Sequence, residues 1–366
     1  MNLKCPKTNL LRAVSTVQNV VTGRTTLPVL SNILLEADKK GLRLSATDLN
    51  ITMVAVAECD VTATGAVAVA GKRLADIVRE LPDGDIEIEV DKDWSVTISS
   101  STSVFKLRGI PKDDFPTIQK VPDKADIEVP QAVLGEMIRK TVFAASHDES
   151  RHVLNGLYVK LGATRITMVA TDGRRLTLFG KEAEIGGEDR EMIIPAKAVI
   201  ELSRVLGDEG NVGLSMMDNQ IGFTIDGTHM TCRLIEGTFP NYEQVLPKKN
   251  DKVVGLDRTE LMQAVRRMSL VTDEKSNSVK FEVSPKQLVL TAGAADVGEG
   301  REQISLDYND EAISIAFNPA FLLDFLKNEG ADEICMELGD SLSPGLFRPG
   351  EQGADEYLYV VMPIKI

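Results

Sequence analysis

The feature that most constrains the fold of this chain is an internal repeat. The letters Ala-Thr-Asp of Ala46–Leu49 return in Ala170–Gly173, and Phe115–Pro116 returns as Phe239–Pro240, both at an offset of 124 residues. The full length of 366 residues is close to three times that distance. Units of this size are whole domains, because solenoids stack much shorter repeats. The repeat therefore predicts three similar domains in a row, over residues 1–124, 125–250 and 251–366.

Each unit changes from helical to strand-like spacing of its apolar residues and then does so again. In the first unit, Leu10, Val14 and Val17 recur at helical spacing, and strands are expected at 42–47 and 51–57. The second unit repeats the order, with strands expected at 154–160 and 166–170. The sequence predicts an α+β fold in which each unit runs helix, strands, helix, strands. One helical layer against one sheet per unit is the economical way to bury these faces.

Composition excludes several classes of protein. The formal net charge of −14 argues against a protein that holds nucleic acid by its overall field. No run of 18 apolar residues predicts a membrane span, and the N-terminus lacks the pattern of a signal peptide. The four cysteines are far apart in sequence and form no CxxC pair, and there are only three histidines. We therefore expect a cytoplasmic protein with no structural disulfide, no metal site and no cofactor.

Basic residues are concentrated on the expected helices although the chain as a whole is acidic. They outnumber acidic residues on five of the six helices, whereas the sixth is nearly neutral. One interpretation is a set of ordinary solvated helix faces, and the other is a basic surface lined by equivalent helices. The basic residues in question are Lys7, Arg12, Lys72, Arg73, Arg79, Arg139, Lys140, Lys197, Arg204, Arg266, Arg267 and Lys327.

Several motifs, in order and at the right spacing, give the chain a close resemblance to a known family over nearly its whole length. They are Thr26–Asn32, Leu154–Gly156, Ala170–Leu176, Gly237–Tyr242 and Tyr359–Ile366. The chain resembles the β subunits of bacterial DNA polymerase III, the DNA sliding clamps. The resemblance implies a head-to-tail homodimer of three-domain protomers. Such a dimer is a closed ring of six domains with helices lining the hole and sheets outside.

The family function implied by this resemblance is that of a processivity factor rather than an enzyme. The ring encircles duplex DNA without regard to sequence, so topology rather than affinity retains it, and an acidic exterior with a mildly basic bore is suitable. The resemblance points to Arg24, Arg73, Arg151 and His152 as DNA contacts. His152 stands where the family often has an aromatic residue. For Arg24 the alternative is a loop charge in water.

The resemblance also implies a cleft for short peptide motifs of the replicative polymerase, the clamp loader, other polymerases and repair proteins. Aliphatic, proline and methionine side chains make an adaptable apolar pocket, and arginines can bind the polar parts of a peptide. Gln244, Ser276 and Pro344 depart from the family pattern. The alternative for Leu176 and Val360 is a plain core role. The cleft positions are Leu154, Thr171, Gly173, Arg174, Arg175, Leu176, Pro240, Val245, Val360, Met362, Pro363 and Ile364.

The same resemblance implies where the ring closes. The strand that contains Phe105 is expected to pair with the third domain of a second copy, near Leu270 and Val271. The alternative for Phe105 is an ordinary core residue.

Two other functions are compatible with parts of the sequence. Asp48 and Asp172, each preceded by threonine, could be phosphoryl-accepting carboxylates of an enzyme. Their equivalent repeat positions favour a turn role, and no catalytic motif accompanies them. The second alternative is a three-domain peptide-binding scaffold that does not encircle DNA.

Overall fold

The computed structural model describes the chain except for residues 22–26, 185–188, 274–276, 295, 352 and 366. It divides into two compact units. The first comprises Met1–Val133 with Lys197–Leu234, and the second comprises Leu134–Ala196 with Ile235–Ile366. The division falls inside α3 (Gln131–Thr141) and at the start of α4 (Ala196–Ser203).

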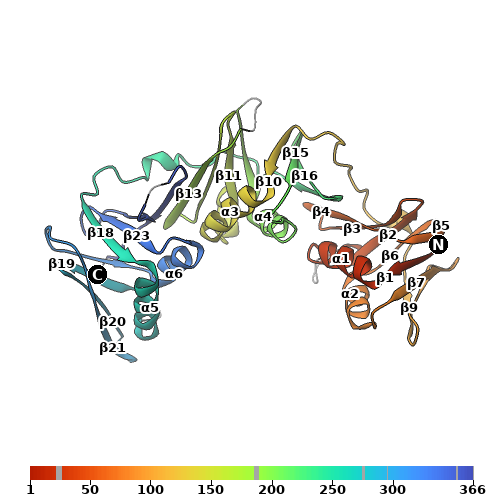
Figure 1. Cartoon of the computed structure of the whole chain (residues 1–366), viewed down its shortest axis with the longest axis horizontal. Helices are drawn as coiled ribbons and strands as arrows, with labels where there is room; N and C mark the ends of the chain where they lie inside the picture. Colours follow the sequence, from red (N-terminus) through yellow and green to blue (C-terminus); the bar gives the residue numbers. More distant parts are fainter. Residues whose placement is uncertain (22–26, 185–188, 274–276, 295, 352, 366) are drawn as a thin grey trace. The chain divides into compact units, whose positions relative to one another are not determined.

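The first unit contains two antiparallel sheets and the helices α1 (Lys7–Gln18) and α2 (Gly71–Glu80), which lie side by side (Figure 1). A five-stranded sheet has the order β5-β1-β7-β8-β9, and an eight-stranded sheet has the order β10-β15-β16-β17-β4-β3-β2-β6. The strands are β1 (Asn2–Pro6), β2 (Asn32–Asp38), β3 (Gly41–Thr47), β4 (Ile51–Ala57), β5 (Asp60–Ala63), β6 (Gly65–Ala70), β7 (Asp85–Val90), β8 (Ser95–Ser99), β9 (Val104–Arg108), β10 (Ile127–Pro130), β15 (Asn211–Met217), β16 (Gln220–Ile225) and β17 (Thr228–Arg233).

The second unit also contains two antiparallel sheets, with α5 (Arg258–Met268) packed against α6 (Pro319–Asn328). The orders are β14-β11-β12-β13-β25-β24-β23-β18 and β21-β20-β19-β22. The strands are β11 (Gly156–Leu161), β12 (Arg165–Thr171), β13 (Arg175–Glu182), β14 (Arg190–Pro195), β18 (Lys252–Asp257), β19 (Val279–Ser284), β20 (Gln287–Ala294), β21 (Gly298–Ser305), β22 (Ile313–Phe317), β23 (Glu333–Leu338), β24 (Gly345–Pro349) and β25 (Glu356–Val361).

Short 3₁₀ turns complete the described structure. They are η1 (Pro28–Ser31), η2 (Lys112–Asp114), η3 (Val142–Ala144), η4 (Glu149–Leu154), η5 (Tyr242–Gln244) and η6 (Ser269–Val271). The strand predicted from Leu154 is wrong at its start, because Leu154 ends η4 and β11 begins at Gly156. No described helix is long and apolar enough to cross a membrane.

The expected order of helix, strands, helix, strands is incomplete, because a short strand precedes each of the six α-helices found in the described residues. The chain repeats strand, helix and three strands six times, beginning with β1-α1-β2-β3-β4 and β6-α2-β7-β8-β9. In the first unit, these leading strands are exchanged: β1 pairs with β7 and β6 pairs with β2. The prediction of one sheet against the helices is therefore wrong. The first unit has two sheets, and each takes the leading strand of the other strand-helix-three-strand segment.

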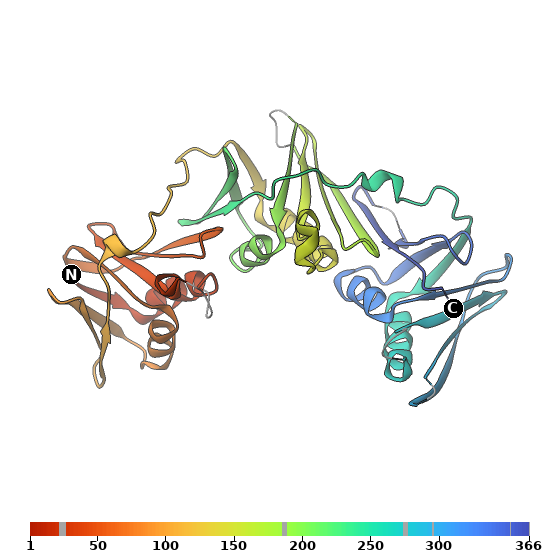
Figure 2. The ribbon, with the colours of Figure 1, turned by 180° about the vertical axis from the view of Figure 1, so that it is seen from behind.

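The repeated Phe-Pro motifs hold the extended segments that follow them against the sheets. Phe115 is buried in a cluster with Leu34 and Ala68. It stands at the start of the segment between η2 and β10, whose extended course can be followed by its colour in Figure 2. Phe239 is buried against Leu178 and Val360 of the second unit. Each buried phenylalanine contributes about 1.5–3 kcal/mol relative to an exposed one. The repeated Phe-Pro motif thus marks an equivalent buried phenylalanine in each of the two compact units.

Candidate functional site

The turn between β12 and β13 is the centre of the candidate site. The Thr171 hydroxyl donates to the Arg175 carbonyl oxygen at 2.6 Å and accepts from the Gly173 N–H at 3.0 Å. The Asp172 carboxylate accepts from the N–H groups of Arg174 at 2.9 Å and Arg175 at 3.1 Å. Gly173 has φ +86°, in the region that glycine adopts at little cost. Asp172 therefore shapes the turn.

The earlier copy of this motif makes the same hydrogen bonds. The Asp48 carboxylate accepts from the N–H groups of Asn50 at 3.0 Å and Ile51 at 2.7 Å, and the Thr47 hydroxyl donates to the Ile51 carbonyl oxygen at 3.0 Å. Two copies with one hydrogen-bond pattern favour the turn interpretation over a catalytic carboxylate. Among the described residues, no group of three or more His, Cys, Asp or Glu side chains could hold a metal ion.

The Arg175 side chain contacts several groups of the second unit. Its side chain is 9% exposed, and its guanidinium donates to Asp172 at 3.1 Å, Asp324 of α6 at 2.6 Å and the Phe143 carbonyl oxygen at 2.7 Å. The guanidinium carbon also lies 4.5 Å from the ring centroid of Phe321. Burial works to lower the pKa of Arg175, but contacts with Tyr359 and Asp324 raise it overall. Arg175 thus joins β13 to α6 and forms one wall of the site.

An apolar pocket of about 130 Å³ opens beside this turn. It brings together all of the predicted cleft residues except Pro363 and Ile364, and it adds Tyr242, which the sequence analysis missed. The only signal for Tyr242 was its place at the end of the Gly237–Tyr242 motif. The lining residues are Leu154, Thr171, Gly173, Arg174, Arg175, Leu176, Pro240, Tyr242, Val245, Val360 and Met362.

The pocket has a buried floor and an exposed rim. Leu176 and Val360 pair across β13 and β25 and are buried in the same apolar cluster as Phe239. They are therefore core residues and pocket floor at once, so the two interpretations do not exclude each other. Val245 and Met362 are each 41% exposed, which leaves apolar surface available to a ligand.

The described part of the chain end makes backbone contacts near the pocket, whereas the described departures from the family pattern do not line it. The Met362 N–H donates to the Arg174 carbonyl oxygen at 2.9 Å, and the Ile364 N–H donates to Ala316 at 2.8 Å. Gln244 is an exposed residue at the end of η5, and the Pro344 carbonyl oxygen accepts from the Asn250 amide at 3.0 Å. Neither Gln244 nor Pro344 lines the pocket, and Ser276 lies outside the described residues.

The four candidate DNA contacts differ in their exposure and in the contacts that they make with other residues. Arg24 lies outside the described residues. Arg73 and His152 are exposed, and neither has an ion pair within the described parts of the chain. Arg151 donates to the Asp148 carboxylate at 3.0 Å and to the Asp172 carbonyl oxygen at 2.8 Å, so it also supports the turn of the cleft.

The basic helix residues divide into structural and exposed groups. Lys7 donates to the Leu81 carbonyl oxygen, and Lys140 lies 4.8 Å from the Tyr357 ring centroid and 3.7 Å from Glu329. Lys197, Arg204 and Arg267 pair with nearby acids. Among the basic helix residues named in the sequence analysis, those that are exposed and make no ion pair within the described ranges are Arg12, Lys72, Arg73, Arg139, Arg266 and Lys327.

Two of the three candidate seam residues, Phe105 and Leu270, are exposed, and Val271 is half-buried. Phe105 is 39% exposed on β9, which is an edge strand, so the core interpretation of Phe105 is wrong. Leu270 and Val271 belong to η6, which lies against β20 and β21, and Leu270 is 75% exposed. β21 is likewise an edge strand of its sheet.

These features define a class of protein: a repeated α+β chain without catalytic groups in its site, which presents an apolar docking pocket beside its last strand. The models of three domains of the DNA polymerase III β subunit match it, the N-terminal domain at residues 1–119, the central domain at 128–241 and the C-terminal domain at 243–365. The chain belongs to this family, and the prediction of three α+β domains of this fold is confirmed.

Relatives and solved structures agree with the family. A "Beta sliding clamp" from a Synechocystis strain is 35% identical in an alignment of 391 positions that covers 100% of both chains. Crystal structures of sliding clamps from Pseudomonas aeruginosa and Bartonella birtlesii, both bound to griselimycin, are each 32% identical with a TM-score of 0.93 over the full length of both chains. The chain is accordingly a sliding clamp, a processivity factor of DNA polymerase III, and not an enzyme.

Proposed function

We propose that this sliding clamp acts through three surfaces: basic helix faces toward duplex DNA, the pocket beside β25 for partner peptides, and a seam that closes a homodimer. The pocket is the observation that carries the proposal. Its exposed apolar rim next to buried Leu176 and Val360 suits aliphatic anchors of a short peptide, each contributing about 1.5–3 kcal/mol. The replicative polymerase, the clamp loader, other polymerases and repair proteins take turns at this pocket.

The DNA-facing surface comprises Arg24, Arg73, Arg151 and His152. The exposed guanidinium of Arg73 on α2, which makes no ion pair within the described ranges, supports this assignment, because sequence-independent contacts are made to phosphates. The acidic total charge of −14 is compatible with it, because a closed ring does not depend on affinity to stay on DNA. Few phosphate contacts leave the ring free to slide.

The seam joins β9 of one copy to β21 of another in a head-to-tail arrangement. Strand pairing within the chain supports this seam. In two places the last strands of two strand-helix-three-strand segments pair with each other, β4 with β17 and β13 with β25. β9 and β21 are the two last strands that have no such partner in their sheets. Two copies placed in this way close a ring.

The domains are proposed as residues 1–124, 125–250 and 251–366, in line with the offset of the motifs and with the family matches. We also place the protein in the cytoplasm, where its polymerase works.

Replacing an exposed rim residue by an acid tests the pocket. In Val245→Asp, a carboxylate must lose water when an apolar ligand covers it, so griselimycin should bind at least tenfold more weakly. Isothermal titration calorimetry of the purified protein measures this. Val253→Asp is the control, because Val253 is 49% exposed on β18 and does not line the pocket. Equal affinities for the two variants would place the ligand elsewhere.

Neutralising Arg73 tests the DNA surface. In Arg73→Gln, binding to linear duplex at low salt should weaken, and the slope of log K against log salt should fall by about 0.9, the effect of one phosphate contact. Fluorescence anisotropy across a salt series measures both. Lys39→Gln, an exposed lysine in the turn between β2 and β3, should leave the slope unchanged. An unchanged slope for Arg73→Gln would remove Arg73 from the DNA surface.

A further inference from the structure

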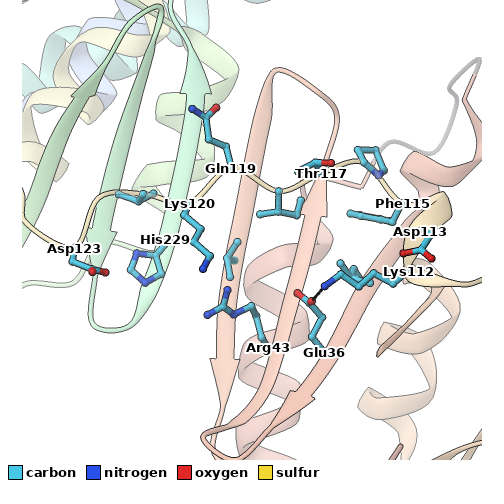
Figure 3. A pocket seen from close by; sticks show the side chains of 15 residues that line it. Glu36, Arg43, Lys112, Asp113, Phe115, Thr117, Gln119, Lys120, Asp123 and His229 are labelled. Carbon is cyan, nitrogen blue, oxygen red and sulfur yellow. Dashed lines mark hydrogen bonds and ion pairs between the residues drawn. The ribbon is translucent and has the colours of Figure 1, made fainter. Parts of the chain in front are cut away.

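A second hollow, of about 480 Å³, lies in the first unit beneath the extended segment that follows η2. Figure 3 shows its wall of β2, β3, β4 and β17, with the segment from Phe115 to Asp123 crossing above them. Leu34 and Val54 provide an apolar floor, and buried Phe115 closes one end. The hollow is therefore a built feature of the fold rather than a gap between surface loops.

Two exposed cations, Arg43 and Lys120, lie in the middle of this hollow. Glu36 stands directly opposite Arg43 in the register of β2 and β3, but its carboxylate accepts from Lys112 at 2.6 Å instead. Within the described ranges, neither Arg43 nor Lys120 makes an ion pair. Figure 3 shows the Lys120 amine and the Arg43 guanidinium pointing toward one another. Like charges directed at each other favour an anion between them.

The other titratable groups leave this middle position cationic. His229 lies beside Arg43, and its Nδ1 is 3.2 Å from the Thr224 hydroxyl. Burial, followed by the charge of Arg43, lowers the pKa of His229 although Asp123 opposes the shift, so the neutral ring is favoured. Asp113 and Asp123 stand at opposite ends of the hollow (Figure 3). A carboxylate bound between Arg43 and Lys120 thus avoids both acids.

The internal repeat places this hollow at the equivalent of the space beside the peptide pocket. Leu178 pairs with Leu358 across β13 and β25, and the equivalent pair across β4 and β17 is Val54 with His229. Thr167 of β12, 124 residues after Arg43, lines a hollow that shares Tyr242 with the peptide pocket. The equivalent hollow in the second unit has a mixed lining that includes Glu243, Glu356 and Lys248, whereas the middle of the hollow in the first unit holds Arg43 and Lys120.

We propose that this hollow is a second docking site, which takes an extended segment of a partner protein with a carboxylate flanked by apolar side chains. The carboxylate lies between Arg43 and Lys120, where the guanidinium offers two parallel donors. The flanking apolar groups lie on Val54 and Leu34. The inference rests on the proposed role of the chain as a docking platform, and it extends that role to partners of acidic sequence.

The test uses a fluorescein-labelled five-residue peptide of alternating leucine and aspartate, titrated with the full-length protein by anisotropy. The charge reversals Arg43→Glu and Lys120→Glu should each weaken binding at least tenfold. Lys40→Glu, an exposed lysine outside the hollow, should bind as the parent does. The same peptide with lysine in place of aspartate should not bind.

Griselimycin titrated into the same variants separates this inference from the proposed function. Its binding should persist in Arg43→Glu and Lys120→Glu and be weakened in Val245→Asp. The inference is overturned if the acidic peptide shows no saturable binding up to 1 mM, or if its binding is insensitive to both charge reversals. It is also overturned if Val245→Asp alone removes binding of the acidic peptide, which would place that peptide in the apolar pocket.

Discussion

Arg175→Ala is expected to lower the free energy of unfolding of the second unit by about 3 kcal/mol or more. The substitution removes a side chain that is 9% exposed and leaves the Asp172 and Asp324 carboxylates without their cation. It also leaves the Phe143 carbonyl oxygen without its donor and opens a space beside Phe321. Urea denaturation, followed by tyrosine fluorescence of the second unit, measures the change.

Arg174→Ala is the matched control, because Arg174 is the exposed neighbour in the same turn. Its effect should stay within about 0.5 kcal/mol. Arg175→Lys should fall between the two, since an ammonium keeps the charge but lacks the planar fork. If Arg175→Ala unfolds at the same urea concentration as Arg174→Ala, the joining role assigned to Arg175 is wrong.

Leu270→Asp is expected to weaken the homodimer about 30-fold or more. Leu270 is 75% exposed in the single chain and lies at the proposed seam, where an unpaired carboxylate would lose its water. Truncation of a central interface residue typically costs about 2 kcal/mol or more, and the added charge increases the cost. Sedimentation equilibrium across a range of protein concentrations measures the dimer dissociation constant.

Phe105→Asp should act in the same way from the other side of the seam. Leu342→Asp is the control, since Leu342 is 67% exposed in the second unit but lies outside the proposed seam. Circular dichroism should show all three variants folded. A dimer that tolerates both seam variants as well as it tolerates Leu342→Asp would contradict the pairing of β9 with β21.

Much of the architecture could be predicted because the repeat is carried by residues with local roles. Asp48 and Asp172 bond to the backbone within their own turns, so a short motif was enough to identify them. Phe115 and Phe239 are anchors at matching positions, so their offset measured the domain length. The strands that precede the helices were missed because each has only four to six residues and leads into a helix, so its alternation is too short to stand out in the sequence.

The remaining site properties depend on contacts between segments far apart in sequence. Nothing near Arg175 in the sequence indicates that its guanidinium donates to Asp324 and lies over the ring of Phe321. Lys140 reads as a helix-surface cation, yet it lies over the ring of Tyr357, 217 residues later. Tyr242 was missed as a pocket residue for the same reason. The pocket lining itself came from family resemblance, because its apolar residues alone do not differ from core residues.

The central claim is that enclosure, rather than affinity, holds this protein on DNA. The direct measurement loads the labelled protein with its clamp loader and ATP onto nicked circular DNA, then cuts half of the sample with a restriction enzyme. Gel filtration at about 1 M salt, where the screening length is about 3 Å, removes phosphate attraction. The account predicts that the protein stays with circles and leaves linear DNA. Equal release from both would show that the protein is a peptide-binding scaffold that does not encircle DNA.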